Sequence, residues 1–125
     1  MKTVIIIEDE KDARQVIREC LLPYNDLVLI CECDNGKDAI EKINELRPDI
    51  IFLDVQLPGL NGFEVIDRLQ HKPSVVITTA HEDYAIKAFN YEVADYVLKP
   101  FERARLEAAI TKAKNDLYYR MGTEG

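Results

Sequence analysis

The sequence predicts an α/β fold in which one parallel sheet is covered by helices on both faces. Five short apolar runs alternate with longer segments whose apolar residues recur every three or four positions, as in successive β-α units. The runs are continuously apolar rather than alternating, which is typical of strands buried on both faces. With 125 residues and no internal repeat, the chain fits one domain with a core of its own.

Residues 1–48 contain the first two units. The run 4–7 predicts a strand, and the helix after it closes near Pro23. A second strand at 27–33 is followed by the turn Asp34-Asn35-Gly36 and a helix that ends at Pro48. The apolar positions of the two helices are Ala13, Val16, Ile17, Cys20 and Leu21, then Ala39, Ile40, Ile43 and Leu46.

Residues 50–117 contain the other three units. Strands are predicted at 50–53, 75–78 and 93–98. Asn61 is expected to cap the third helix, which is halted before Pro73. The apolar positions of the last three helices are Phe63, Ile66 and Leu69; Tyr84, Ala85, Ala88 and Phe89; and Leu106, Ala109, Ile110, Ala113 and Leu117.

Composition narrows the function classes. The net charge of -7, from 16 basic and 23 acidic side chains, argues against nucleic-acid binding by this segment. No stretch approaches the roughly 20 apolar residues of a membrane span. The run 4–7 ends in acidic residues and is too short for a signal peptide, so we expect a cytoplasmic protein.

The three cysteines are an odd set, Cys20, Cys31 and Cys33. In a reducing cytoplasm we expect free thiols that pack as small apolar side chains. Cys31 and Cys33 would share one face of a strand, but no His or further Cys lies near them in sequence, so packing is favoured over a metal site.

Polar residues follow four of the predicted strands: Glu8 and Asp9, then Asp54, Thr79 and Lys99. Taken singly, each has an ordinary explanation, such as an Asx-turn at Asp54 or a solvated charge at Lys99. Together they lie at the carboxyl ends of parallel strands, the edge where ligands bind in open α/β sheets. The coincidence favours a functional site.

The chemistry of that site follows from its charges. Carboxylates about 4 Å apart repel by about 4 kcal/mol per pair at an effective dielectric of 20, so they require a cation. Oxygen ligands select Mg²⁺, Ca²⁺ or Mn²⁺, and Mg²⁺ keeps waters that phosphate oxygens can replace. Lys99 and Thr79 would contact a phosphate, leaving Asp54 as a nucleophile that forms an aspartyl phosphate.

A family resemblance extends over residues 3 to about 117. The motifs that carry it are Glu8-Asp9, Asp54 with Leu57-Pro58-Gly59-x-x-Gly62, Thr79-Ala80, and Asp95-Tyr96-Val97-Leu98-Lys99-Pro100-Phe101. In this order they resemble the receiver domain of bacterial two-component response regulators. The segment 78–89 is similar to receivers of LytTR-type transcription regulators. The resemblance implies a flavodoxin-like (βα)5 fold of strand order 2-1-3-4-5.

The resemblance also implies residue roles. Asp54 would accept a phosphoryl group from a sensor histidine kinase, with Mg²⁺, or Mn²⁺ as an alternative, as cofactor. The metal would be held by Glu8, Asp9, Asp54 and the backbone carbonyl of Gln56, with Glu8 acting mainly through water. The phosphoryl and switch residues would be Thr79, the Ala80 backbone, Lys99 and Tyr96; Pro100 would follow a cis peptide; and Gln56 and His81 would tune dephosphorylation.

The wider protein is predicted from the same resemblance. Residues 1–119 would form the receiver domain, and 120–125 a linker-like tail toward a missing C-terminal effector domain. DNA would be bound only through that domain, no membrane contact is expected, and phosphorylation would promote a homodimer through the fourth helix, fifth strand and fifth helix. The chain would not be an enzyme beyond accepting a phosphoryl group and slowly losing it.

Alternatives remain at this stage. A stand-alone receiver or phosphorelay module has the same site residues. A haloacid-dehalogenase-type phosphatase also uses an aspartyl phosphate, but its Asp-x-Asp motif would require an acid where this chain has Gln56. A degenerate receiver that only binds proteins would not need the intact set of Asp9, Asp54, Thr79 and Lys99.

Overall fold

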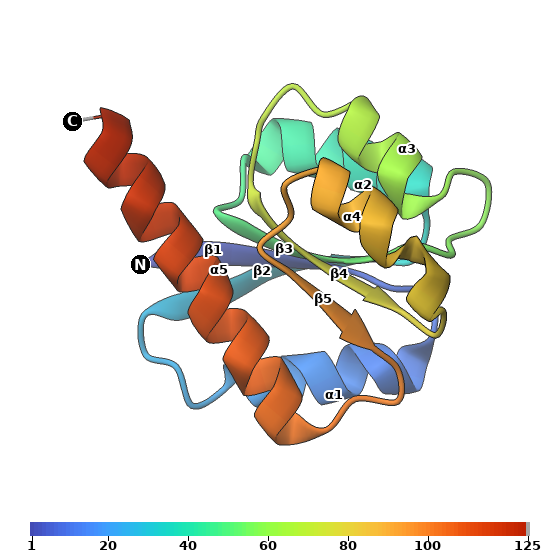
Figure 1. Cartoon of the computed structure of the whole chain (residues 1–125), viewed down its shortest axis with the longest axis horizontal. Coiled ribbons are helices and arrows are strands. Elements are labelled where there is room, and N and C mark those ends of the chain that lie inside the picture. The colour runs from blue at the N-terminus through green and yellow to red at the C-terminus, as the bar shows by residue number, and fades with distance from the viewer. Residues whose placement is uncertain (125) are drawn as a thin grey trace.

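A computed structural model describes residues 1–124, with side chains described through residue 120. Five parallel strands form one sheet in the order β2-β1-β3-β4-β5 (Figure 1). The strands are β1 Lys2–Ile7, β2 Leu27–Cys33, β3 Ile50–Asp54, β4 Ser74–Thr79 and β5 Asp95–Leu98. The helices are α1 Lys11–Leu21, α2 Gly36–Leu46, α3 Gly62–Asp67, α4 Ala85–Asn90 and α5 Arg103–Glu124, with a 3₁₀ turn at Glu82–Tyr84. The predicted strand order is confirmed.

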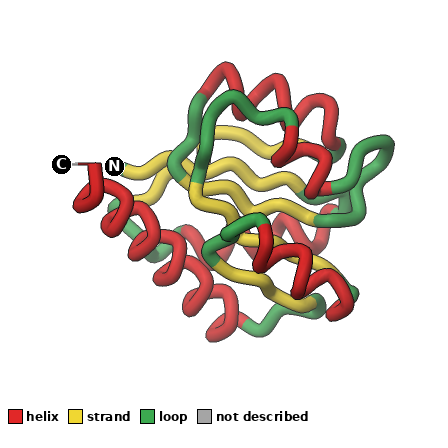
Figure 2. The backbone as a smooth tube through the Cα atoms, turned by 45° about the horizontal axis from the view of Figure 1, so that its top comes forward, coloured by secondary structure: helices red, strands yellow, loops and turns green. Residues whose placement is uncertain are grey.

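The sheet is the middle of three layers (Figure 2). α1 and α5 cover one face, where Phe52 and Leu106 are among the buried residues. α2, α3 and α4 cover the other, where Leu53 and Phe63 are buried. Successive residues of β3 thus enter opposite cores, which explains why the central strands are continuously apolar.

The edge strand β2 departs from this pattern. Its outer positions Val28 and Ile30 are 37% and 38% exposed, because no strand lies beyond it. Its pairing with β1 also shifts between Val4 and Ile5, which face Leu29 and Cys31. Ile30 is therefore an extra residue, as in a β-bulge.

The third helix begins where the sequence predicts. The Asn61 side chain accepts from the backbone N–H of Glu64 at 2.9 Å, and the Glu64 side chain accepts from the N–H of Asn61 at 3.1 Å. This reciprocal capping box satisfies two donors that a helix start leaves free. The helix ends at Asp67, so the predicted Leu69 lies beyond it.

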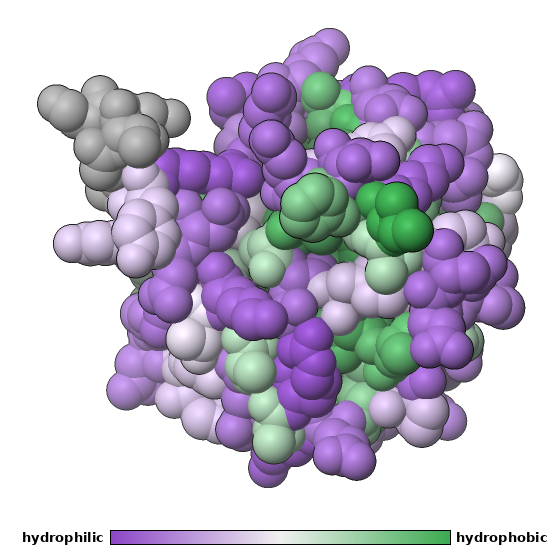
Figure 3. All heavy atoms as spheres, viewed as in Figure 1, coloured by the Kyte–Doolittle hydropathy of each residue, from purple (hydrophilic) through white to green (hydrophobic). Residues whose placement is uncertain are grey.

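The fourth helix corrects one expectation. It has only six residues, and Phe89, which the periodicity assigns to its apolar face, is 82% exposed. Ala88 is the buried residue, and Ile86 is 80% exposed. In so short a helix a few apolar positions do not define which side meets the sheet. Figure 3 shows the resulting apolar side chains on the surface over α4.

The last helix is longer than predicted. α5 continues through the segment 120–124 that was expected to be a linker-like tail, and residue 125 lies outside the described residues. Gly122 costs about 1 kcal/mol relative to Ala in a helix, which is not enough to end one that is already formed. None of the described helices combines the length and apolar character needed to cross a membrane.

Candidate functional site

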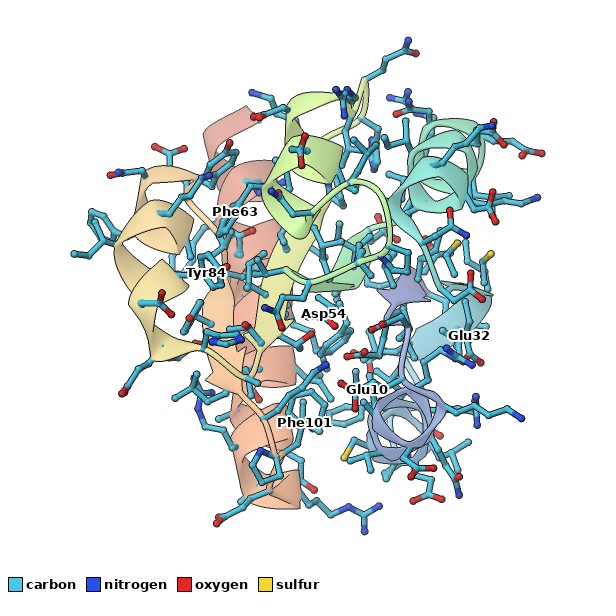
Figure 4. All side chains as sticks on the ribbon, turned by 90° about the vertical axis from the view of Figure 1, so that its right-hand side faces the viewer. Glu10, Glu32, Asp54, Phe63, Tyr84 and Phe101 are labelled. Atoms are coloured by element: carbon cyan, nitrogen blue, oxygen red, sulfur yellow. The ribbon has the colours of Figure 1, made fainter. Side chains whose placement is uncertain are left out.

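The strand ends bring the predicted residues to one edge of the sheet (Figure 4). Asp54 is the last residue of β3 and pairs with Thr78, so Thr79 ends the neighbouring strand one step further on. Lys99 follows β5, and its backbone N–H donates to the Thr79 carbonyl at 2.8 Å. Register between parallel strands thus converts distant sequence positions into neighbours.

Four carboxylates form the centre of the site. Glu8, Asp9, Glu10 and Asp54 each offer an oxygen, and these oxygens all lie within 4.8 Å of one another. Glu8 and Asp54 are buried, whereas Asp9 and Glu10 are exposed. The three predicted acids, Glu8, Asp9 and Asp54, therefore lie together, and Glu10 is a fourth member of the group.

Lys99 is the cation of this group. Its Nζ lies 2.6 Å from Oε1 of Glu8, 3.0 Å from Oδ2 of Asp54 and 3.2 Å from Oε1 of Glu10. Burial would lower the pKa of Lys99, but its close ion pair with Glu8 and its hydrogen bond to Asp54 outweigh that effect and raise the pKa above its ordinary value. The ammonium therefore stays charged. The Lys99-Pro100 peptide is cis, as predicted.

Glu8 is fully buried and incompletely satisfied. Its Oε2 accepts from the N–H of Glu10 at 3.0 Å. Its Oε1 is close to Lys99 but outside hydrogen-bond geometry, and it has no hydrogen-bond partner among the described residues. Burial raises the pKa of Glu8 to about 7, and the Asp54 carboxylate adds to the rise, against the ion pair with Lys99 and the hydrogen bond from the Glu10 N–H.

The Asp54 carboxylate makes two kinds of contact. Its Oδ1 accepts from the N–H of Gln56 at 3.1 Å, which is an Asx-turn, while Oδ2 contacts Lys99. The loop that follows is held against the strand by the Gly62 N–H, which donates to the Val55 carbonyl at 2.8 Å. A Cβ on Gly62 would lie 2.6 Å from the Asp54 carbonyl oxygen, so this position requires glycine.

Thr79 and Tyr96 meet at a third residue. The Thr79 hydroxyl accepts from the N–H of His81 at 3.1 Å, and the Tyr96 hydroxyl donates to the His81 carbonyl. Among the described hydrogen bonds, neither reaches Asp54. Ala80, which lies between Thr79 and His81 in the chain, is exposed at the surface. The loop after β4 therefore links the two predicted switch residues.

The donor set suits a hard divalent cation. All the candidate ligands are oxygens, four carboxylates face one ammonium, and a buried oxygen of Glu8 lacks a hydrogen bond. Mg²⁺ prefers such oxygen ligands and is usually held by one or two carboxylates with several waters. Glu8, Asp9 and Asp54 could hold it here.

Comparison with known proteins identifies the family. The profile of the response regulator receiver domain matches residues 4–111. The chain belongs to the response regulator receiver domain family. The family match favours a receiver over the phosphatase alternative.

Two curated relatives show which response regulators this receiver domain is similar to. The transcriptional regulatory protein BtsR of Escherichia coli K12 is 39% identical over 118 residues, which cover 93% of the chain and 49% of BtsR. The sensory transduction protein LytT of Bacillus subtilis is 38% identical over 117 residues, which cover 91% of the chain and 48% of LytT. The chain spans about half the length of the curated relatives it matches. The predicted likeness to LytTR-type regulators is confirmed.

Solved structures agree with the fold. The response regulatory domain of mrkE from Klebsiella pneumoniae superposes with a TM-score of 0.84 at 31% identity, covering 94% of this chain and 98% of that one. The receiver domain of a putative Luxo repressor protein from Vibrio parahaemolyticus has a TM-score of 0.87 at 25% identity, and the match covers 99% of this chain and 98% of that one.

One member of the site was not predicted from the sequence. Glu10 lies within the carboxylate group and pairs with Lys99, yet it follows the first strand by three residues and was not selected. The run of three consecutive acids from Glu8 to Glu10 was the available indication.

Proposed function

We propose that this receiver domain takes a phosphoryl group from a sensor histidine kinase onto the carboxylate of Asp54, with Mg²⁺ bound by Glu8, Asp9, Asp54 and the backbone carbonyl of Gln56. The observation that carries the proposal is the buried Asp54 carboxylate, 3.0 Å from Lys99 within a group of four carboxylates. A buried carboxylate at a strand end, paired with a lysine ammonium, is suited to nucleophilic attack.

In the transfer step, an Asp54 carboxylate oxygen attacks the phosphorus atom of a phosphohistidine. The new O–P bond forms as the P–N bond breaks, and the electron pair of that bond leaves with the imidazole. Lys99 would neutralise a phosphoryl oxygen, and Thr79 and the Ala80 N–H would donate to others. The bound metal would supply further charge neutralisation.

The switch would act through His81. The Thr79 hydroxyl accepts from the His81 N–H and would turn its own O–H toward a phosphoryl oxygen, which would shift His81, and Tyr96 is bonded to the same residue. Moving a population from 1:99 to 99:1 takes about 5.5 kcal/mol. Two hydrogen bonds to the charged phosphoryl group, at about 1.5–3 kcal/mol each, would supply much of it. Gln56 and His81 would govern the slow loss of the phosphoryl group.

The kinase would dock beside the site. A surface hollow lined by Ala13, Val16 and Phe101, together with Lys99 and Pro100, opens next to the carboxylates. Its apolar walls suit a helix of the partner that carries the phosphohistidine. The domain would then work in the cytoplasm, where such kinases phosphorylate their partners.

The output would lie in a second domain. LytT and BtsR are about twice the length of the matched region, and BtsR is described as a transcriptional regulatory protein. We infer that residues 1–119 form the receiver and that α5 leads toward a DNA-binding domain. Phosphorylation would favour a homodimer across α4, β5 and α5, where Ile86, Phe89 and Leu98 are exposed.

Intact mass measurement tests the proposal. After incubation with Mg²⁺ and acetyl phosphate, the chain should gain the mass of one phosphoryl group. Asp54→Asn should gain none, while Asp34→Asn, at an exposed aspartate of the β2-α2 turn, should behave as the wild type. An equal gain in Asp54→Asn would refute the assignment of the acceptor.

A further inference from the structure

One guanidinium clamps the turn between β1 and α1, which carries three of the four carboxylates of the site. Arg14, near the start of α1, donates from Nη1 to the backbone carbonyl of Glu8 at 2.7 Å. Its backbone N–H donates to the carbonyl of Glu10 at 3.1 Å. These two carbonyls belong to the residues on either side of Asp9. Arg14 therefore holds the main chain around one proposed metal ligand.

Asp9 depends on that main chain for its orientation. Its carboxylate is exposed, and it makes no hydrogen bond or ion pair with the part of the chain that the structure describes. Glu8, in contrast, is fixed by burial and by the N–H of Glu10. A ligand whose side chain has no support of its own can be preorganised only through the backbone that carries it. The rigidity of the turn thus decides how well Asp9 is placed.

Glu32 of β2 holds the Arg14 side chain in place. Its carboxylate accepts two hydrogen bonds from Arg18, at 2.9 and 2.8 Å, and its Oε1 lies 3.6 Å from Nε of Arg14. The Arg14 side chain is only 17% exposed, against 44% for Arg18, so Arg14 is part of the packed structure rather than a solvated charge. The Glu8 N–H also donates to the Cys33 carbonyl at 3.0 Å. In Figure 4 the labelled Glu32 lies beside α1, which is seen nearly end-on. Strand β2 therefore supports the turn at two points.

We propose that Arg14 is a positioning residue for the metal site, which fixes the turn so that the Asp9 carboxylate stays with those of Glu8 and Asp54. The inference rests on the proposed function and adds to it a residue that supplies no metal ligand. A charged donor makes a stronger hydrogen bond to a carbonyl than a neutral donor does. Groups that orient metal ligands typically contribute about 10–100-fold to metal affinity. Because Arg14 acts through the main chain, we expect the lower end of that range.

The charge of Arg14 alone predicts the opposite effect. A guanidinium close to a cation site repels the metal, so removing the charge without disturbing the turn would tighten Mg²⁺ binding. Loss of positioning weakens it. The sign of the change in affinity therefore separates the two roles.

Isothermal titration calorimetry with Mg²⁺ on the whole chain tests the proposal without any phosphorylation step. Arg14→Met should weaken Mg²⁺ binding about 10-fold. Arg14→Lys should also weaken it, because lysine keeps the charge but lacks the planar fork that contacts a carbonyl and a carboxylate together. Arg18→Met is the matched control: it removes both hydrogen bonds to Glu32 but no contact with the turn, and it should lose much less affinity.

Phosphorylation provides a second measurement. With acetyl phosphate, Arg14→Met should need about 10-fold more Mg²⁺ for half its maximal rate of mass gain. Its rate at saturating Mg²⁺ should stay near that of the wild type, because Arg14 contacts neither Asp54 nor Lys99 among the described residues. A variant that was merely unstable would lose rate at every Mg²⁺ concentration.

The controls separate this inference from the proposed function. Circular dichroism checks that each variant is folded, and Arg14→Lys carries the test if Arg14→Met is not. Unchanged or tighter Mg²⁺ binding in the folded Arg14 variants would overturn the proposal. An equal loss in Arg18→Met would do so too, because it would assign the effect to Glu32 rather than to the turn. A wild-type chain that binds no Mg²⁺ would refute the proposed metal site itself, and this inference with it.

Discussion

Lys99 holds together carboxylates that would otherwise repel, and its removal should expose that repulsion. In Lys99→Met the ion pairs to Glu8 and Asp54 are lost; each is worth about 5–6 kcal/mol at 2.6–3.0 Å and an effective dielectric of 20, before desolvation is counted. Glu10 is 65% exposed, so its pair adds at most about 1 kcal/mol.

Breaking a buried ion pair by removing one partner costs about 3–5 kcal/mol net. Burial already raises the pKa of Glu8 to about 7. Glu8 can therefore take up a proton in the variant, which places the expected loss near the lower end, about 3 kcal/mol. Mg²⁺ should reduce this deficit, because the cation should bind the variant more tightly than the wild type once the competing ammonium is gone, and each tenfold gain in affinity adds about 1.4 kcal/mol.

Urea unfolding at neutral pH, with either EDTA or Mg²⁺, measures both effects. Lys37→Met is the matched control: it removes an exposed lysine of α2 and should change the free energy of unfolding by less than about 0.5 kcal/mol. A free energy of unfolding of Lys99→Met in EDTA equal to that of the wild type would contradict this prediction, as would a deficit of the same size in Mg²⁺.

Three further substitutions test other contacts of the fold and the site. Asp9→Asn relieves repulsion, so it should raise the unfolding free energy in EDTA by about 0.2–1 kcal/mol and reduce the stabilisation by Mg²⁺; a loss of stability in EDTA would contradict this. Gly62→Ala should lower stability by about 1–3 kcal/mol and slow phosphorylation by acetyl phosphate, because its Cβ would press on the Asp54 backbone; wild-type values for both would refute it. Asp95→Asn should cost about 1.5–3 kcal/mol at neutral pH. Burial would raise the pKa of Asp95, but its bonds from Arg105 and the Tyr96 N–H outweigh that and lower it. The Asp95 carboxylate therefore contributes fully to the free energy of unfolding above its ordinary pKa of 3.8, and this contribution is lost as the pH falls through its lower pKa in the folded protein. Urea titrations should show that the stability deficit of Asp95→Asn shrinks on acidification.

The local features of the fold were predictable because their causes are local. β2 spans 27–33 as predicted, since a turn at Asp34-Asn35-Gly36 follows it directly. The Asn61 cap was predictable from a short polar side chain before an apolar period. The prediction that Phe89 lies on the buried face of α4 was wrong, because its orientation depends on which side of a six-residue helix meets the sheet.

The site was predictable only in part. That Asp54 and Lys99 lie at strand ends follows from the pattern of apolar runs, and their convergence follows from the parallel sheet. The participation of Glu10 was not predictable, because it depends on the path of the chain between β1 and α1. The link between Thr79 and Tyr96 through His81 likewise depends on the loop after β4.

The sequence by itself determined the alternation of strands and helices, the family, and the chemical types of residue at the strand ends. These follow from burial periodicity, caps and breakers, whose free energies act within a few residues. Only the tertiary structure decided that Lys99 contacts three carboxylates and that a bulge at Ile30 turns Cys31 and Cys33 toward the side of the sheet that α2 covers. Both depend on strand register, which is set when distant segments pack together and fill two cores at once.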